Sequence, residues 1–197
     1  MLLLALALPG CRSGGAAAPV VIGAKVTPAE FGSMHNVSRV GALWIGSYPS
    51  PSDLDLAARR GVDVVIDLSA ESERPGWDLA AACGRFGIEH VRIGVASPKR
   101  VGDEEVDRCL AALRRAGGRQ ALLFCAHGDR AAMFLAIHRA ADQGLPIADA
   151  LDEARRAGMK PGLPEAFVRQ QVERLAAQAA VAQDDARSPI ASAIDAH

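Results

Sequence analysis

A short segment of the chain brings a thiol, a glycine and a guanidinium together. From Cys125 to Arg130 it reads Cys-Ala-His-Gly-Asp-Arg, between the apolar run 121–124 and a helical pattern that begins at Ala131. A buried strand, a tight turn and a helix amino terminus would direct backbone N–H groups, helix-dipole potential and a fixed positive charge to one place. Such surroundings favour an oxyanion ligand and hold a cysteine as its reactive thiolate, with a lowered pKa. The segment therefore predicts an oxyanion site with Cys125 as nucleophile.

Strands and helices alternate around this segment. Apolar and β-branched runs predict strands at 37–40, 43–46, 62–68, 88–95 and 121–124, the first two as a hairpin. Caps and helical periodicity predict helices at about 51–60, 77–86, 103–116, 131–143, 147–157 and 164–180. The alternation predicts an α/β fold with a mostly parallel central sheet of four to five strands flanked by helices. Ligands of such sheets bind at the carboxyl ends of the strands, which is where Cys125 falls.

Composition narrows the classes of function. At 197 residues, half of them apolar, the chain suits one domain with a sizeable core. A formal net charge of −1, without a basic stripe and interleaved aromatic residues, argues against nucleic-acid binding. His35, His90 and His138 are scattered, and no set of His, Cys, Asp and Glu has metal-ligand spacing. We therefore expect no metal and no other cofactor.

The amino terminus is typical of an exported lipoprotein. Its first eight residues form an apolar run that is too short to span a bilayer but suits a signal peptide, predicted at 1–10. Leu8-Pro9-Gly10-Cys11 resembles the lipobox of bacterial lipoproteins. The resemblance implies cleavage before Cys11, lipid attachment to its thiol and tethering at the outer membrane with the domain facing the periplasm. The alternative is a buried amino-terminal strand or helix.

The predicted signal peptide and lipidation site set the expected limits of the domain. A lipidated flexible linker is predicted at 11–30, the folded domain at 31–180 and a disordered tail at 181–197. Cys83 and Cys109 each lie on the apolar face of a predicted helix, which favours two small buried side chains. A disulfide between them stays open, because an exported protein meets oxidising conditions.

The chain resembles a known superfamily at its central segment. Cys-x-x-Gly followed by Arg at a helix start, after a buried strand, is similar to the signature of cysteine-dependent protein tyrosine and dual-specificity phosphatases. The stretches 36–40, 43–47, 49–54, 61–68 and 73–76 are similar in order and spacing to the phosphatase-like domain of beta-lactamase-hydrolase-like bacterial proteins. The resemblance covers most of residues 35–160 and implies a dual-specificity-phosphatase-like fold.

The resemblance also implies hydrolysis of phosphomonoesters through a phosphocysteine. Cys125 would attack phosphorus in line, and water would then hydrolyse the intermediate. Loop N–H groups would hold the phosphoryl oxygens, and the guanidinium would bind two of them in bidentate fashion. The phosphate-binding residues would be Ala126, His127, Gly128, Asp129 and Arg130. The expected partner is a phosphorylated protein or a small phosphomonoester; the oligomeric state stays open.

The segment departs from the family pattern in three ways. Four residues separate Cys125 from Arg130, where the usual phosphatase loop has five. Shorter loops occur in the beta-lactamase-hydrolase-like relatives and also in rhodaneses, whose six-residue loop carries a persulfide. Phe124 replaces the usual histidine, and Ala131 replaces the hydroxyl residue that helps to discharge the phosphocysteine. Slow turnover is expected, with two alternatives: a rhodanese-like sulfurtransferase, or a weak pseudophosphatase that binds a phosphorylated partner.

The general acid implied by the family is an aspartate on the loop after the strand that ends near Val95. Asp103 is the only aspartate available there, and it is also the favoured N-cap of the following helix. Asp129 would oppose phosphate if it faced inward, so we expect it to face outward. His127 is equally consistent with a substrate contact and with a solvent-facing loop residue.

Overall fold

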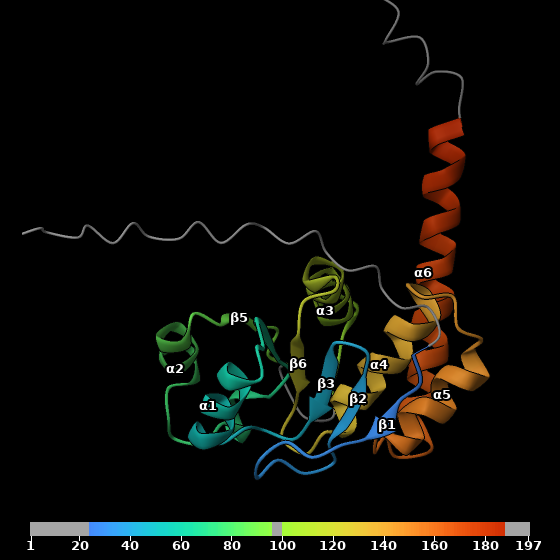
Figure 1. Ribbon diagram of the computed structural model, residues 1–197. Helices are drawn as coiled ribbons and strands as arrows, with labels where there is room; N and C mark the ends of the chain where they lie inside the picture. Colours follow the sequence, from blue (N-terminus) through green and yellow to red (C-terminus); the bar gives the residue numbers. More distant parts are fainter. Residues whose placement is uncertain (1–23, 96–99, 188–197) are drawn as a thin grey trace, which may run out of the picture.

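The computed structural model describes residues 24–95 and 100–187, which build an α/β fold on one mixed sheet (Figure 1). Its strands lie in the order β1-β2-β3-β6-β4-β5. Their bounds are Thr27–Pro28 (β1), Ser38–Val40 (β2), Leu43–Gly46 (β3), Val64–Asp67 (β4), Glu89–Arg92 (β5) and Ala121–Phe124 (β6). β3, β6, β4 and β5 are parallel, and β1 and β2 extend the β3 edge in antiparallel fashion. The predicted fold class is confirmed, with six strands rather than four to five.

Helices cover both faces of the sheet. They are α1 (Pro51–Arg59), the 3-10 helix η1 (Glu71–Glu73), α2 (Leu79–Phe86), α3 (Asp103–Ala116), α4 (Asp129–Ala141), α5 (Ile147–Arg156) and α6 (Leu163–Arg187). Along β6, Leu122 and Phe124 join the core shared with α1 and α2, whereas Ala121 and Leu123 join the core shared with α3 and α4. Because β6 is buried on both faces between β3 and β4, it holds the segment that follows it in a fixed place.

The predicted start of α1 is confirmed as a capping box. Ser50 Oγ accepts a hydrogen bond from the Asp53 N–H, and the Asp53 carboxylate accepts one from the Ser50 N–H at 2.8 Å. Asp53 is buried and also accepts from the backbone and hydroxyl of Ser33, both at 2.7 Å. This carboxylate therefore ties the start of α1 to the segment before β2.

Two predicted segment limits differ from the structure. Thr27 and Pro28 pair with β2, so the last part of the predicted 11–30 linker belongs to the sheet; a two-residue strand that contains proline leaves no periodic signal. α6 continues to Arg187, beyond the predicted end near residue 180, because its alanine-rich sequence has high helix propensity. Its residues 176–187 are exposed and project from the domain (Figure 1). The signal peptide and Cys11 lie outside the described residues.

Cys83 and Cys109 are both free and buried. Cys83 belongs to the core on the α1 and α2 side of the sheet, and Cys109 belongs to the core on the α3 and α4 side. The sheet therefore separates the two thiols, and the disulfide considered above is excluded. Burial raises the pKa of Cys83 to about 11.

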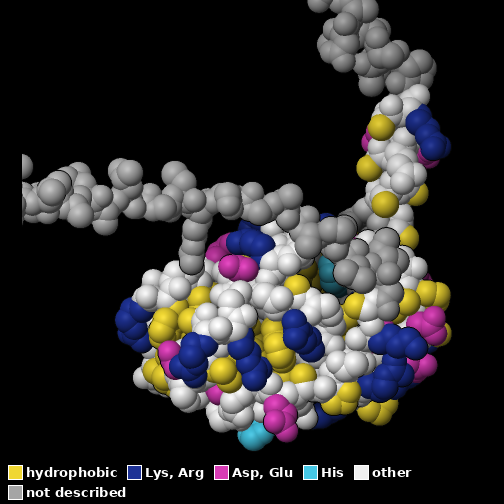
Figure 2. Space-filling view, viewed as in Figure 1, with side chains coloured by type: hydrophobic (Ala, Val, Ile, Leu, Met, Phe, Trp, Pro, Cys, Tyr) yellow, Lys and Arg dark blue, Asp and Glu magenta, His cyan; other side chains and the backbone are white. Residues whose placement is uncertain are grey.

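The surface carries charges of both signs. Figure 2 shows Lys and Arg side chains interspersed with Asp and Glu over the face it presents, in keeping with the formal net charge of −1. Within residues 24–95 and 100–187, no helix is both long and apolar enough to cross a membrane.

Candidate active site

The loop after β6 has the strand–turn–helix geometry that the sequence predicts. β6 ends at Phe124, Cys125 follows it, and α4 begins at Asp129, two residues earlier than predicted. Gly128 sits between them with φ of 92°, a backbone conformation that favours glycine. A Cβ at Gly128 would lie 3.1 Å from Asn36 Cβ, so the loop needs both the backbone freedom and the small size of glycine.

A second segment supports the loop from the side. Asn36 Nδ2 donates to the His127 carbonyl oxygen at 2.8 Å, and Asn36 itself has a φ of 51°. The Tyr48 N–H donates to the Ala126 carbonyl oxygen at 3.4 Å. His127 is exposed, whereas Ala126 is partly buried. The segments that flank β2 and β3 therefore hold the loop backbone and leave the His127 side chain free to face solvent.

The Cys125 sulfur is enclosed by backbone and side-chain groups. Cys125 is fully buried, and its Sγ accepts the Gly128 N–H at 3.1 Å. Burial raises the pKa of this thiol; the N–H of Ala131 and the charge of Arg130 act in the opposite direction without reversing it. The prediction of a lowered pKa for Cys125 is thus wrong, because removal from water outweighs the helix terminus.

Arg130 is held by groups that lie far from it in the sequence. Its Nη2 donates to both carboxylate oxygens of Glu73, with a distance of 2.6 Å to Oε1, and its Nη1 donates to the Leu68 carbonyl oxygen at 3.2 Å. Both side chains are largely buried, with 8% of Arg130 and 14% of Glu73 exposed. The ion pair fixes the plane of the guanidinium beside the loop. Sequence reasoning missed Glu73 as a site residue, although it lies in one of the stretches that carry the phosphatase resemblance.

The segment that carries Glu73 is anchored by a buried aspartate. Asp67, at the end of β4, accepts from the Ser69 N–H at 2.8 Å and pairs with Arg92 at 3.2 Å. Arg92 also pairs with Glu71 at 2.8 Å, and Glu73 itself accepts from the Ala70 N–H. Burial would raise the pKa of Asp67, but the nearby His90 ring at 3.9 Å, the hydrogen bond from the Ser69 N–H and the charge of Arg92 lower it. This network fixes η1 against β4 and β5, and with it the partner of Arg130.

Two of the expectations for acidic residues are wrong. Asp103 is not the N-cap of α3, since Gly102 takes that position and its N–H is bound by Glu105. Asp103 accepts instead from Gln171 Nε2 of α6 at 2.7 Å, so it connects two helices. Asp129 directs its Oδ1 toward the nucleophile, where it accepts from Cys125 Sγ at 3.5 Å, although 30% of the side chain is exposed.

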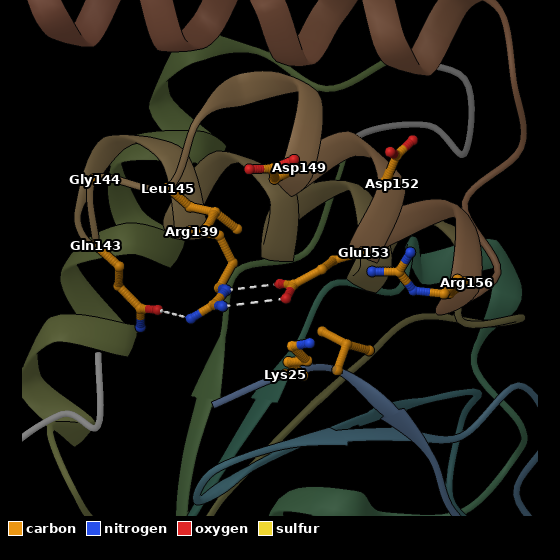
Figure 3. Close-up of a pocket in the computed structure, with 10 residues that line it drawn as sticks. Lys25, Arg139, Gln143, Gly144, Leu145, Asp149, Asp152, Glu153 and Arg156 are labelled. Carbon is orange, nitrogen blue, oxygen red and sulfur yellow. Dashed lines mark hydrogen bonds and ion pairs between the residues drawn. The ribbon is translucent and has the colours of Figure 1, made fainter. Parts of the chain in front are cut away.

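Two cavities lie at the opposite end of the sheet from Cys125. One, of about 620 Å³, is lined by Lys25, Gln143 and Asp149, with the buried Arg139–Glu153 ion pair at its wall (Figure 3). The other, of about 660 Å³, is lined by residues that precede β3 and β6. No loop residue from 125 to 130 lines either cavity. Within the described part of the chain, no group of three His, Cys, Asp or Glu residues could hold a metal ion.

Comparison with known proteins places this fold beside cysteine-dependent phosphatases. No family model and no curated protein sequence matches the chain. Among solved structures, TpbA of P. aeruginosa aligns with a TM-score of 0.63 and 25% identity over 78% of this chain and 94% of its own. A DUF442 protein of Shewanella putrefaciens, described as a candidate phosphatase, aligns with a TM-score of 0.60 and 19% identity over 74% and 94%.

A third similar structure is Tk-PTP in its active form. It aligns with a TM-score of 0.59 and 22% identity over 67% of this chain and 91% of its own. A Cys-to-Ser variant of TpbA has also been solved in complex with phosphotyrosine. These similarities show a dual-specificity-phosphatase-like fold, in agreement with the fold that the sequence implied.

Proposed function

We propose that this protein is a cysteine-dependent phosphatase that hydrolyses phosphomonoesters through a phosphocysteine at Cys125. The observation that carries the proposal is the placement of Cys125 Sγ under the N–H of Gly128, with the guanidinium of Arg130 fixed beside the same loop by Glu73. The complex of TpbA with phosphotyrosine supports a phosphorylated substrate.

Cys125, the loop N–H groups, Arg130 and Glu73 each have a role in this reaction. The Cys125 thiolate attacks phosphorus, and the S–P bond forms as the bond to the leaving oxygen breaks. The loop N–H groups and Arg130 stabilise the charge on the three phosphoryl oxygens. Glu73 orients Arg130 without touching the substrate, so it is a positioning residue. Water then releases phosphate from Cys125.

The alcohol oxygen leaves either with a proton from a general acid or, if it is acidic enough, as an oxyanion. The Asp103 carboxylate accepts a hydrogen bond from Gln171, so we do not assign the role of general acid to Asp103. A phosphatase without a positioned acid depends on the acidity of the leaving group itself. We therefore expect aryl phosphates to be hydrolysed faster than alkyl phosphates by this protein.

The test is turnover of p-nitrophenyl phosphate by the wild type and by Cys125→Ser. Turnover by the wild type, its loss in Cys125→Ser and its retention in the control Cys83→Ala are the expected results. Acid quench followed by peptide mass spectrometry is expected to find phosphate on Cys125. Absence of both turnover and the phosphopeptide would refute the proposal.

Two alternative functions each have an observation in their favour. The six-residue loop favours a rhodanese-like sulfurtransferase, which predicts Cys125-dependent transfer of sulfur from thiosulfate to cyanide. The raised pKa of Cys125 favours a pseudophosphatase, which predicts binding of tungstate or phosphopeptide without hydrolysis. The turnover assay separates the phosphatase from both alternatives, and the sulfur-transfer assay separates the two alternatives from each other.

We also propose, from the sequence alone, that the protein is exported and lipid-anchored through Cys11 at a bacterial outer membrane. The expected result is incorporation of radiolabelled palmitate by cells that produce the wild type and none by cells that produce Cys11→Ser. Equal labelling of the two proteins would contradict the anchor.

A further inference from the structure

The carboxylate of Asp129 is a titratable group that is hydrogen-bonded to the nucleophile. Cys125 Sγ lies 3.5 Å from Asp129 Oδ1, and the sulfur is the donor in this hydrogen bond. The same oxygen accepts from the Arg130 N–H at 2.9 Å, which holds the carboxylate in place at the first turn of α4. The structure therefore contains a thiol whose proton is directed at a fixed carboxylate.

The charges around this pair nearly cancel. Arg130 approaches from α4, but Glu73 of η1 neutralises it. Lys160, between α5 and α6, lies 3.9 Å from Asp129 Oδ2 and is largely exposed, so its charge is screened. With Asp129 ionised, an incoming phosphate dianion meets a negative charge beside the sulfur and a thiol that cannot attack. One proton transfer removes both obstacles.

We propose that Asp129 is the catalytic base that takes the thiol proton of Cys125 when phosphate binds, and that it holds this proton until phosphate leaves. This inference rests on the proposed phosphatase function. The proton moves from Sγ to Asp129 Oδ1, which gives a thiolate and a neutral carboxylic acid in one step. The acid then donates a hydrogen bond to a phosphoryl oxygen instead of repelling it.

The remaining steps need only water and exchange of protons with solvent. The thiolate displaces the alcohol, which leaves as an oxyanion and takes a proton from solvent. Water hydrolyses the phosphocysteine, which regenerates the thiolate and releases phosphate and one proton to solvent. Asp129 then returns its proton to the sulfur. The net reaction is phosphomonoester plus water giving alcohol plus phosphate.

The proposal predicts a particular pH profile. The reactive pair carries one proton in all, so kcat/KM should rise as the doubly protonated pair loses its first proton and fall as it loses its second. Asp129→Asn has no carboxylate to hold a proton, so its kcat/KM should rise with thiolate formation and then stay level. The control Asp149→Asn removes the same charge from an exposed site on α5 and should keep the wild-type profile.

The test combines this profile with a titration that needs no substrate. The rate of Cys125 alkylation by iodoacetamide is followed against pH by peptide mass spectrometry in the wild type, Asp129→Asn and Asp149→Asn. Loss of a carboxylate 3.5 Å from the sulfur should lower the thiol midpoint, the pH at which the alkylation rate reaches half its maximum, by about 1 to 3 pH units. A decrease of this size, with an alkaline fall of kcat/KM only in the two proteins that keep Asp129, supports the inference.

Three outcomes would overturn it: equal thiol midpoints, a wild-type kcat/KM that stays level above the midpoint, or an alkaline fall that survives in Asp129→Asn. Absence of both turnover and the phosphopeptide in the wild type refutes the phosphatase function itself. The inference is then decided by infrared difference spectra on addition of tungstate. A protonated carboxyl band in the wild type, absent in Asp129→Asn, supports proton transfer, and its absence from both proteins refutes it.

Discussion

The ion pair between Glu73 and Arg130 is the contact on which the site most depends, and Glu73→Gln tests it. The substitution keeps the size of the side chain and one acceptor oxygen, but it removes the charge and the bidentate geometry. The guanidinium then keeps only its bond to the Leu68 carbonyl oxygen at 3.2 Å and one bond to the amide. We expect Arg130 to lose its fixed orientation beside the Cys125 loop.

The size of the effect follows from burial. Removing one partner of a buried ion pair costs about 3–5 kcal/mol, because it leaves the other charge uncompensated. Glutamine still accepts one hydrogen bond, so we expect a loss of roughly 1–3 kcal/mol in the free energy of unfolding. In a domain of this size that corresponds to a decrease of about 2–12 °C in melting temperature. A misplaced guanidinium should also lower kcat/KM on the order of 10²-fold.

Thermal unfolding and hydrolysis of an aryl phosphate measure the two effects. The matched control is Glu71→Gln, in the same 3-10 helix. The Glu71 carboxylate is 78% exposed and pairs with Arg92 and Arg74 rather than with Arg130. Its loss should change the melting temperature by at most about 2 °C and kcat/KM by less than threefold, as expected for exposed ion pairs.

A kcat/KM of Glu73→Gln equal to or above that of the wild type would contradict an orienting role of Glu73. That result would mean that Glu73 weakens Arg130 as a phosphate ligand by neutralising it, rather than orienting it. A loss of activity equal in Glu73→Gln and Glu71→Gln would show instead that any disturbance of η1 is sufficient.

Three further substitutions test other parts of the site. Gly128→Ala requires an alanine at φ of 92° and a Cβ 3.1 Å from Asn36, so we expect a loss of about 2 kcal/mol in unfolding free energy and at least tenfold in turnover; wild-type behaviour would contradict the loop geometry. Arg92→Met leaves the fully buried Asp67 without the cation that pairs with it, so we expect the free energy of unfolding, measured by urea denaturation, to fall by about 3–5 kcal/mol. An unchanged free energy of unfolding would show that the pair contributes nothing to stability. Asp53 has a lowered pKa, because its hydrogen bonds to the serines outweigh burial; it stabilises the fold above its unfolded pKa of about 3.9, and this stability is lost as pH falls through the folded pKa. Asp53→Asn should therefore be destabilised near pH 6 but show a flatter decline below pH 4, and parallel curves would refute this.

Much of the framework was predictable from local patterns. The β-branched run that became β4, the capping box at Ser50 and the glycine before α4 act over a few neighbouring residues, so one sequence is enough to detect them. β1 escaped detection because two residues have no periodicity. The end of α6 was placed too early because helix propensity, rather than an apolar face, sustains its exposed last turns.

The candidate site also contains residues that local signals predict and residues that they do not. Cys125, Gly128 and Arg130 follow from strand, turn and helix signals that adjoin one another in the chain. Glu73 does not, because it meets Arg130 across 57 positions through the parallel pairing of β4 with β6. The place of Asp103 after β5 made it the candidate general acid. Its hydrogen-bond partner Gln171 comes from α6, and no local signal predicts that α6 packs there.

Local patterns were enough to predict the fold class and to select Cys125, Gly128 and Arg130 as candidate site residues, because strand, turn and helix propensities act between neighbouring residues. The chemical state of these residues depends on the tertiary structure. Whether Cys125 is a thiol or a thiolate depends on how far the surrounding core removes it from water. Whether Arg130 is free or clamped, and whether Asp129 faces the sulfur, depends on which groups the packed elements bring within a few ångströms. Electrostatic interactions and desolvation act through space, so only the folded chain contains them.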